Sequence, residues 1–284
     1  MKVFLNGSII NDSQASVKAE TDGLFYGAGC FETLTSYRGK FIHLERHIKR
    51  LNDGAVYLTG LEEEFFHVEV IRNNILELLE ANTLTNTRSR VRIQYSITER
   101  LGYKQSVSKP ISSILITAGS VPENPADSYY LSTVDTTVVP ASSRPVNLKL
   151  SNMLHYREAA IKAKKTGADD ALMLTINGHI AETAIANIFW EKDGTVFTPS
   201  DDCDILPGIT RTIVMEIIRR SGGQVKSGRF YPDELNEASQ VWLCNSVKEI
   251  ASVTQIDNNM YPANSEFINS LIQDFENYKK NNLT

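Results

Sequence analysis

The stretch that decides the fold is VNLKLSNMLHYREAAIKAKKTGADDALMLTINGHIAETAIANIFW, residues 146–190. A strand-like segment ends at Lys149, an amphipathic helix is expected at about 151–165, and a second strand region carries Glu182 and Asn187. A lysine inside an apolar strand is costly unless it is paired or used, because burial disfavours its charged form. A lysine whose pKa is lowered in this way is a nucleophile, as a Schiff base with a carbonyl compound requires.

The carboxylate of Glu182 is the second chemical group of this stretch. With Asn187, which precedes a Phe-Trp strand, it is placed to face a protonated ring nitrogen, so the stretch outlines a cofactor site. A second interpretation is that Lys149 ends a strand at the surface and that Glu182 is solvated, since both residue types are mostly exposed. The residues of this stretch leave both interpretations open.

Motifs spread along most of the chain decide between them. In order they are YGAGCFET (26–33), HIKRL (47–51), LKLSN (148–152), AETAIANIFW (181–190), ILPGITR (205–211) and CNSVKEI (244–250). A single motif of this kind is weak, but six in this order resemble the class IV aminotransferase superfamily. These are the fold-type IV pyridoxal phosphate enzymes, which include branched-chain aminotransferases, D-amino-acid aminotransferases and 4-amino-4-deoxychorismate lyase.

The resemblance implies an α/β (α+β) fold of two domains, like that of D-amino-acid aminotransferase. A smaller N-terminal α/β domain is expected at residues 1–118. A larger, cofactor-binding and barrel-like β domain with helices is expected at 128–284. Between them, GSVPENPAD at 119–127 contains two prolines and few apolar residues, which is typical of a linker.

Hydrophobic periodicity and turn residues predict the individual elements. The expected strands are a hairpin at 3–10, a second hairpin that turns at 38–40, a strand at 89–97, a strand at 111–118 and two strands broken at Asn245-Ser246. In the strand at 89–97, alternation buries Val91, Ile93, Tyr95 and Ile97 and turns Arg90, Arg92 and Gln94 to the other face. One helix is expected to begin at residue 44, and three others are expected at 62–82, 210–220 and 265–278. The tail at 279–284 is expected to fray.

The resemblance also implies roles for single residues. Lys149 would hold pyridoxal 5'-phosphate and move protons at the substrate Cα. Glu182 would keep the pyridine nitrogen protonated, which preserves the ring as an electron sink, and Asn187 belongs to the same cofactor-binding set. The expected phosphate ligands are Arg50, Ser246 and the start of the helix at Ile209 and Thr210.

These phosphate ligands have a physical basis, and each has a plainer interpretation. A guanidinium such as that of Arg50 suits a bidentate phosphate contact, although a helix arginine is usually solvated. The helix start at Ile209 and Thr210 offers backbone N–H groups to an anion, although most loop-to-helix junctions bind nothing. His43 and His47 are four residues apart, but Leu44 stands where a metalloprotease helix has its glutamate, so no metal site is predicted.

Departures from the family patterns bear on which member this is. Branched-chain aminotransferases place a tyrosine shortly after the lysine, whereas here Asn152 and Met153 follow and the first tyrosine is Tyr156. D-amino-acid aminotransferases place an arginine after the VRIQYS type of strand to bind the substrate carboxylate. In this sequence Ile97 and Thr98 stand there, and Arg100 fits only with a shift.

The segments GCFET with Thr33, ANIFW and CNSVKEI most resemble those of 4-amino-4-deoxychorismate lyases. The resemblance therefore predicts a lyase that eliminates pyruvate and leaves 4-aminobenzoate for folate synthesis. The resemblance implies that Thr33 assists the departure of pyruvate and that Phe31, Tyr26 and Arg100 line the substrate side. The alternative is an aminotransferase of branched-chain or D-amino-acid type that transfers an amino group to a 2-oxo acid. An alternative of another class is a catalytically silent binding protein.

Composition sets the remaining expectations. The chain has 284 residues, of which 42% are hydrophobic, and this is enough for two modest cores. Its net charge of -5 gives no electrostatic footprint for nucleic acid, and no apolar run has the length of a bilayer span. Cys30, Cys203 and Cys244 are odd in number and widely spaced, which favours a reducing, cytoplasmic setting. The expected partners are a small amino substrate and, by family habit, a second subunit in a homodimer.

Overall fold

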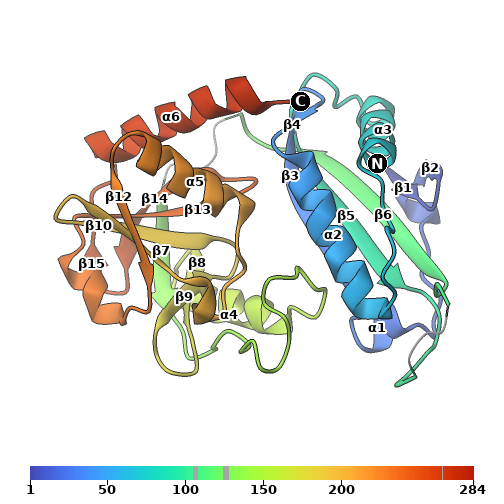
Figure 1. Ribbon diagram of the computed structural model, residues 1–284, viewed down its shortest axis with the longest axis horizontal. Helices are drawn as coiled ribbons and strands as arrows, with labels where there is room; N and C mark the ends of the chain where they lie inside the picture. Colours follow the sequence, from blue (N-terminus) through green and yellow to red (C-terminus); the bar gives the residue numbers. More distant parts are fainter. Residues whose placement is uncertain (105–107, 124–127, 264) are drawn as a thin grey trace. The chain divides into compact units, whose positions relative to one another are not determined.

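The computed structural model describes residues 1–104, 108–123, 128–263 and 265–284. Two compact units make up the chain (Figure 1). Unit 1 contains Met1–Glu123, Leu148–Asn152 and Asn282–Thr284, and unit 2 contains Asn124–Asn147 and Met153–Asn281. The chain first changes unit within the expected linker 119–127, of which 124–127 lie outside the described residues. Lys149 lies in unit 1, although its position in the sequence had placed it in the expected domain 128–284.

Unit 1 is built on a six-stranded antiparallel sheet with the order β2-β1-β6-β5-β3-β4. The strands are β1 (Lys2–Leu5), β2 (Ser8–Asn11), β3 (Gly29–Tyr37), β4 (Lys40–Phe41), β5 (Arg88–Ile97) and β6 (Ser112–Ser120). Both predicted hairpins are confirmed. The first turns at Asn6-Gly7 and the second at Arg38-Gly39, and all four of these residues have positive φ, as tight hairpin turns demand.

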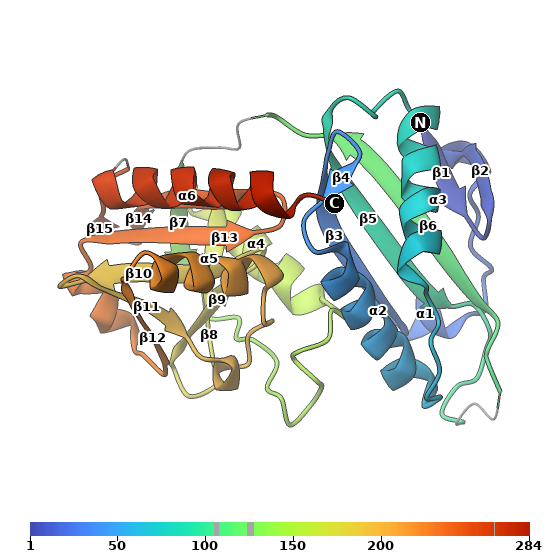
Figure 2. The same ribbon diagram turned by 45° about the horizontal axis from the view of Figure 1, so that its top comes forward.

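Two helices, α2 (Leu44–Thr59) and α3 (Val68–Ala81), pack against one face of this sheet (Figure 2). The short α1 (Asp22–Phe25) precedes β3. Helix α3 begins later than the predicted residue 62, because the Asn52 side chain holds the preceding segment extended. Its Oδ1 accepts from the backbone N–H groups of Phe65 and Phe66, and its Nδ2 donates to the Phe66 carbonyl oxygen.

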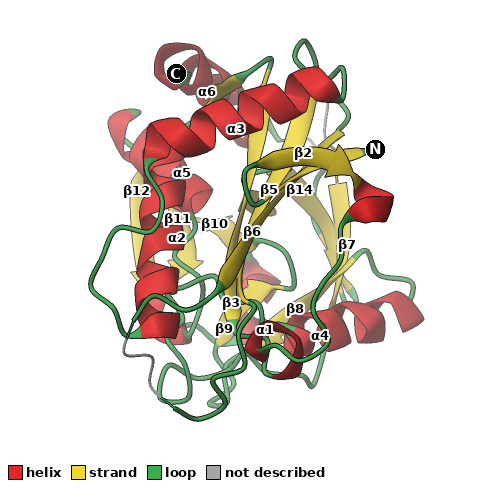
Figure 3. Ribbon diagram, turned by 90° about the vertical axis from the view of Figure 1, so that its right-hand side faces the viewer, coloured by secondary structure: helices red, strands yellow, loops and turns green. Residues whose placement is uncertain are grey.

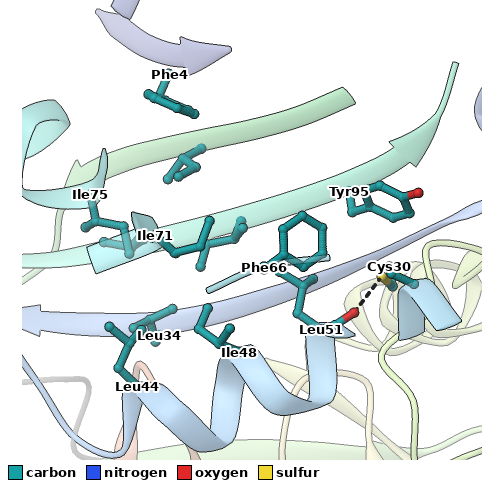
Figure 4. Packing of buried hydrophobic residues seen from close by; sticks show 14 of the residues in the cluster. Phe4, Cys30, Leu34, Leu44, Ile48, Leu51, Phe66, Ile71, Ile75 and Tyr95 are labelled. Carbon is teal, nitrogen blue, oxygen red and sulfur yellow. Dashed lines mark hydrogen bonds between the residues drawn. The ribbon is translucent and has the colours of Figure 1, made fainter. Parts of the chain in front are cut away.

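The core of unit 1 lies between the sheet and these helices (Figure 4). The four residues of β5 predicted to be buried, Val91, Ile93, Tyr95 and Ile97, are all buried. They meet Leu34 of β3, Ile48 and Leu51 of α2, and Ile75 of α3. The other face of β5 carries Arg90, Arg92 and Gln94, as the alternation predicted, so this face is polar.

Unit 2 is built on a nine-stranded mixed sheet that curls into a half-barrel, with the order β12-β11-β10-β13-β14-β7-β8-β9 and β15 paired to β14. The strands are β7 (Ser128–Thr133), β8 (Asp170–Leu174), β9 (Ile180–Thr183), β10 (Asn187–Lys192), β11 (Thr195–Pro199), β12 (Gln224–Gly228), β13 (Gln240–Asn245), β14 (Glu249–Ile256) and β15 (Asn259–Met260). Both the barrel-like sheet and the break between β13 and β14 were predicted.

Three helices accompany this sheet: α4 (Leu154–Lys165), α5 (Ile209–Arg220) and α6 (Glu266–Asn282). Helix α4 packs against β7 and β8 (Figure 3), and α5 packs against β12 and β13. From α6, Phe267 reaches Trp242 of β13, whose ring stacks on Phe189 of β10. Short 3-10 turns occur at Asp12–Gln14, Asp201–Cys203 and Pro232–Glu237.

Two predictions about local structure were wrong. Residues 146–149 do not form a strand, and the helix predicted from 151 begins at Leu154. The backbone of 149–151 is tied to β3 instead, because Phe31 N donates to Lys149 O at 2.9 Å and Ser151 N donates to Gly29 O at 2.8 Å. Residues held extended in this way cannot start a helix.

The C-terminal tail does not fray as predicted. Helix α6 continues to Asn282, and Thr284 then exchanges two backbone hydrogen bonds with Phe41 of β4, at 2.9 and 3.1 Å. These bonds give the tail a fixed partner in unit 1. Among the described residues, no helix combines the length and the apolar character that crossing a membrane requires.

Candidate active site

Lys149 lies beside strand β3 in unit 1. The pleat of β3 turns Glu32 and Leu34 toward α2, so Phe31 and Thr33 lie on the opposite face. The backbone bond from Phe31 N to Lys149 O aligns the two segments, and Lys149 Nζ lies 5.0 Å from the centre of the Phe31 ring. Lys149 is half-buried. The polar face of unit 1 therefore presents an amine next to an aromatic ring and near a threonine hydroxyl.

Arg92 of β5 adds a cation to the same ring. It lies directly opposite Thr33 in the strand register, its guanidinium is 3.7 Å from the centre of the Phe31 ring, and it donates to Gln94 Oε1 at 3.0 Å. Burial and the neighbouring Arg90 lower the pKa of Arg92. Within the described part of the chain, no carboxylate pairs with Arg92. The alternation along β5 predicts that Arg92 lies on this face, but no motif marks it as a site residue.

Arg50 is held by a buried cluster on α2 and β3. Its Nε and Nη2 donate to the two carboxylate oxygens of Glu32, at 2.6 and 2.9 Å, and His47 Nδ1 contacts the same carboxylate at 2.7 Å. Glu32 has no exposed side-chain surface. Burial by itself raises the pKa of Glu32, but Arg50 and His47 outweigh it and lower the value to about 2. The Glu32 carboxylate thus fixes the Arg50 guanidinium in one orientation.

The two histidines considered for a metal have other partners. His43 stands at the N-cap of α2, in the left-handed region, and its Nδ1 contacts Glu45 Oε1 at 3.0 Å. His47 contacts Glu32, as described above. In the part of the chain that the structure describes, no group of three or more metal-ligating side chains gathers.

Tyr26 and Arg100, the other two residues expected on the substrate side, are exposed in unit 1. Tyr26 packs against Tyr103, with ring centres 5.6 Å apart. Arg100 pairs with Glu20 at 2.8 Å and lies over Phe25. Tyr26 thus contacts the loop that follows Arg100, and Arg100 contacts residues that precede Tyr26. The substrate roles of both residues stay predictions.

The glycine-rich motif allows the Lys149 segment to approach β3. A Cβ atom at Gly29 would meet the Tyr95 carbonyl oxygen and the Ser151 hydroxyl, so a larger residue would push the two segments apart. The Ser151 hydroxyl also accepts from Gln94 Nε2 at 2.7 Å. Gly29 therefore belongs to the structure that positions Lys149.

Glu182 is buried in unit 2 and surrounded by donors. Tyr156 donates its hydroxyl hydrogen to Oε1 at 2.5 Å, and Asn187 Nδ2 donates to Oε2 at 3.0 Å. The backbone N–H of Leu206 lies 3.2 and 3.3 Å from the two oxygens. A carboxylate with these donors is stabilised in its charged form, as a partner of a protonated ring nitrogen must be.

The ILPGITR turn joins Glu182 to the start of α5. Asn187 Nδ2 donates to the Leu206 carbonyl oxygen at 3.0 Å as well as to Glu182, so one amide bridges the carboxylate and the turn. Gly208 is the N-cap of α5, and a Cβ atom there would collide with the side-chain oxygen of Asn187. Helix α5 begins at Ile209, and its first backbone N–H groups and its dipole favour an anion.

Ser246 lies beside this helix start. Its hydroxyl is 3.5 Å from the hydroxyl of Thr210, the second residue of α5. The loop that carries Ser246 is shaped by Asn245, whose Oδ1 accepts from the N–H groups of Val247 and Lys248 at 2.9 and 2.7 Å. The structure thus brings together Thr210 and Ser246, as the sequence analysis expected of phosphate ligands.

The donor set of unit 2 fits pyridoxal phosphate. The carboxylate is suited to a ring nitrogen, and Asn187 and Leu206 tie it to the turn that leads to α5. The start of α5, beside the Thr210 and Ser246 hydroxyls, is suited to a phosphate. In unit 1, taken by itself, the amine of Lys149 is of a kind that forms an imine with an aldehyde and moves a proton, and the guanidinium of Arg50 is of a kind that binds a phosphate.

Comparison with known proteins agrees with this chemistry. A family model described as amino-transferase class IV matches residues 29–256. The chain is 30% identical over 279 residues to the aminodeoxychorismate lyase of Bacillus subtilis, covering 95% of this chain and 92% of the relative. It is 29% identical over 261 residues to a putative branched-chain-amino-acid aminotransferase of Methanocaldococcus jannaschii, covering 90% and 88%.

Solved structures show the same fold. The branched-chain aminotransferase of Thermoproteus uzoniensis, solved with norvaline, superposes with a TM-score of 0.88 at 24% identity, covering 100% of this chain and 98% of that one. This is the fold of the fold-type IV pyridoxal phosphate enzymes, as predicted. The chain belongs to the class IV aminotransferase family. It is a pyridoxal-phosphate-dependent enzyme.

Proposed function

We propose that this enzyme is an aminodeoxychorismate lyase, which eliminates pyruvate from 4-amino-4-deoxychorismate and leaves 4-aminobenzoate. The observation that carries the proposal is the polar face of unit 1, where Thr33 lies opposite Arg92 and next to Phe31. The substrate has two carboxylates and a leaving oxygen. Arg92 and Arg90 suit the carboxylates, and a threonine hydroxyl suits the leaving oxygen. Similarity to a lyase over nearly the full length supports the proposal.

The chain's own residues then divide the work. Pyridoxal phosphate, when bound, supplies an electron sink for the carbon that carries the substrate amino group. Lys149 takes the proton from that carbon, and Thr33 donates a hydrogen bond to the oxygen that leaves with pyruvate. Phe31 orients the substrate beside the Lys149 amine. Arg92 binds a substrate carboxylate, because its desolvated guanidinium is paired with no carboxylate among the described side chains.

Other residues hold the cofactor. Glu182 keeps the ring nitrogen protonated, with Asn187 fixing the carboxylate. The phosphate is bound by the backbone and hydroxyl groups at the start of α5, by the Ser246 hydroxyl and by Arg50. Glu32 partly balances the charge of the Arg50 guanidinium. For phosphate binding, the orientation of this guanidinium therefore matters more than its net charge.

An aminotransferase is the second candidate. A 2-oxo acid acceptor such as 2-oxoglutarate also carries two carboxylates, so the arginines suit this reaction as well. Similarity to a branched-chain aminotransferase over 261 residues favours it. The tyrosine that follows the lysine in those enzymes is missing, and the first tyrosine here, Tyr156, is bonded to Glu182 instead.

A paired assay on cofactor-loaded protein separates the candidates. One arm measures release of 4-aminobenzoate and pyruvate from aminodeoxychorismate, and the other measures amino transfer from L- and D-amino acids to 2-oxoglutarate or pyruvate. Lyase turnover at least tenfold faster than transamination is the expected result. Transamination without release of 4-aminobenzoate would overturn the lyase proposal and leave the family assignment untouched.

Replacing Lys149 tests the catalytic amine. We expect Lys149→Ala to lose both activities and the absorbance of the lysine-bound cofactor, because no other amine is placed beside Phe31 among the described contacts. Lys104→Ala, in the loop before β6, is the matched control and should keep both. Activity in the Lys149→Ala enzyme would exclude the role assigned to this lysine.

We also infer a homodimer and a cytoplasmic setting. The inference of a dimer rests on the family habit, and that of the compartment on three cysteines that are all free and buried. Sedimentation of the holoenzyme at micromolar concentration should give twice the chain mass of 31.7 kDa. A species at the mass of one chain would contradict the dimer.

A further inference from the structure

Tyr156 contacts Glu182, the residue proposed to pair with the ring nitrogen of the cofactor. Tyr156 itself has no role in the function proposed above. It lies in the first turn of α4 and is buried, and its hydroxyl donates to Glu182 Oε1 at 2.5 Å. Both residues belong to unit 2. Position 156 lies outside the six motifs that carry the family resemblance.

The Glu182 carboxylate can only accept hydrogen bonds, so the Tyr156 hydroxyl must be the donor. Burial and the charge of Glu182 raise the pKa of Tyr156 well above its usual range. The hydroxyl therefore stays protonated wherever the protein is folded.

Two other polar side chains lie close to Tyr156. The ring of His155 is 4.2 Å from that of Tyr156, and its Nε2 lies 3.4 Å from Arg144 Nη2. Burial and Arg144 lower the pKa of His155 to about 4, so His155 is neutral at pH 7. Arg144 acts in the opposite sense to Glu182, since its charge lowers the pKa of Tyr156. Neither His155 nor Arg144 has a carboxylate, so neither can replace Glu182 as the carboxylate that accepts from the Tyr156 hydroxyl.

A hydrogen bond donated to a carboxylate stabilises its charged form and lowers its affinity for a proton. Oε1 of Glu182 receives this bond from Tyr156 in addition to the bond from Leu206 N. Without the hydroxyl, this buried oxygen loses the shorter of these two bonds, and the carboxylate becomes a better base. A proton shared between Glu182 and a ring nitrogen then moves toward Glu182.

We propose that Tyr156 is a positioning residue that acts through Glu182, holding the carboxylate in one orientation and keeping the shared proton on the ring nitrogen of pyridoxal phosphate. The proposal rests on the role of Glu182 given under the proposed function. It assigns a cofactor-tuning role to the first tyrosine that follows Lys149 in the sequence.

The test compares Tyr156→Phe with Tyr261→Phe. Tyr261 is also buried in unit 2, and its hydroxyl donates to the Leu235 carbonyl oxygen at 3.1 Å, so both variants lose one buried hydroxyl. Each protein is loaded with pyridoxal phosphate labelled at the ring nitrogen, and the NMR shift of that nitrogen reports its protonation. The dissociation constant of the cofactor is measured in parallel.

We expect Tyr156→Phe to shift the ring nitrogen signal toward the unprotonated position and to weaken cofactor binding by about tenfold, as loss of a hydrogen bond to a charged group does. Tyr261→Phe should change neither, while both variants lose similar stability. A purely structural role for Tyr156 would make the two variants alike in all three measurements, and this result would overturn the proposal.

Glu182→Gln separates failure of this proposal from failure of the proposed function. If Glu182→Gln moves the nitrogen signal and Tyr156→Phe does not, the role of Glu182 stands and that of Tyr156 is wrong. If Glu182→Gln leaves the signal unchanged, the role of Glu182 itself is wrong. In the Glu182→Gln background, Tyr156→Phe should add no further shift, because its effect passes through the carboxylate.

Discussion

The carboxylate of Glu32 is enclosed between β3 and α2, with both oxygens hydrogen-bonded and its charge balanced by Arg50 and His47. Removing one partner of such a buried pair leaves an uncompensated charge, which is more costly than exchanging the whole group for apolar side chains. In this protein the charge that would be left is that of Arg50, a proposed phosphate ligand. Stability and cofactor binding are therefore linked at Glu32.

Glu32→Gln should destabilise the protein in a pH-dependent way. The folded-state pKa of Glu32, about 2, lies below the ordinary value of 4.5, so its contribution is fully present above pH 4.5 and is lost as the pH falls toward 2. At pH 7 we expect Glu32→Gln to lower the free energy of unfolding by roughly 3–5 kcal/mol. Urea unfolding of both proteins at pH 7 and pH 3 measures this. A difference that does not shrink in acid would contradict the assigned cause.

Replacing Arg92 is expected to impair the use of substrate rather than the stability of the protein. We expect Arg92→Leu to lower kcat/KM by about 10- to 100-fold, as loss of a charge-assisted hydrogen bond to a carboxylate does. The spectrum of the bound cofactor should be unchanged, because Arg92 contacts Phe31 and Gln94 and is not a proposed cofactor ligand. Lys226→Leu, which removes a cation that lies over Phe197 in unit 2, is the control. Equal kinetics in the two variants would remove Arg92 from the substrate site.

At the scale of elements, the junction between the ILPGITR turn and α5 leaves no space for a side chain at Gly208. Gly208→Ala would push a methyl group against the Asn187 amide that bridges Glu182 and Leu206. We expect a loss of roughly 1–3 kcal/mol in stability and weaker binding of pyridoxal phosphate. Equilibrium dialysis and thermal unfolding measure the two effects. Gly119→Ala, where a Cβ atom meets nothing within 4 Å, should change neither.

Elements were predictable from the sequence where local pattern and tertiary structure agree. The alternation in β5 gave the buried residues correctly, and Asn6-Gly7 gave the first hairpin. The errors lie where a distant group overrides the local pattern. The Asn52 side chain moves the start of α3 to a later residue, and the backbone of β3 holds residues 149–151 extended. Both partners are distant in the sequence, so the local pattern does not reveal them.

The candidate site shows the same division. Motifs identified Lys149, Glu182, Thr210 and Ser246, and the structure brings Thr210 and Ser246 into contact. Motifs gave no prediction for Arg92 or Tyr156, because their proposed roles depend on strand register and on one hydroxyl, and neither leaves a signature at a fixed spacing. Only the strand pairing shows that Arg92 stands opposite Thr33.

At the scale of the whole molecule, the cysteines report on global unfolding. All three are buried, and burial raises the pKa of Cys244 to about 12 and also raises those of Cys30 and Cys203. Because the thiolate is the reactive form, we expect no labelling by a disulfide reagent in the native protein and three labelled thiols in denaturant. Fast labelling of one thiol under native conditions would show that its surroundings open locally.

The path of the chain between its units has a consequence for how the enzyme is made. Residues 1–123 contain all six strands of the first sheet, but the segment that carries Lys149 joins unit 1 only after a stretch of unit 2 has been synthesised. Because domains fold in order as they leave the ribosome, a fragment released early has the sheet, Thr33 and Arg92 but lacks the amine. Chains that end before residue 149 therefore lack the lysine proposed to bind the cofactor, which is added only after more than half of the 284 residues have been synthesised.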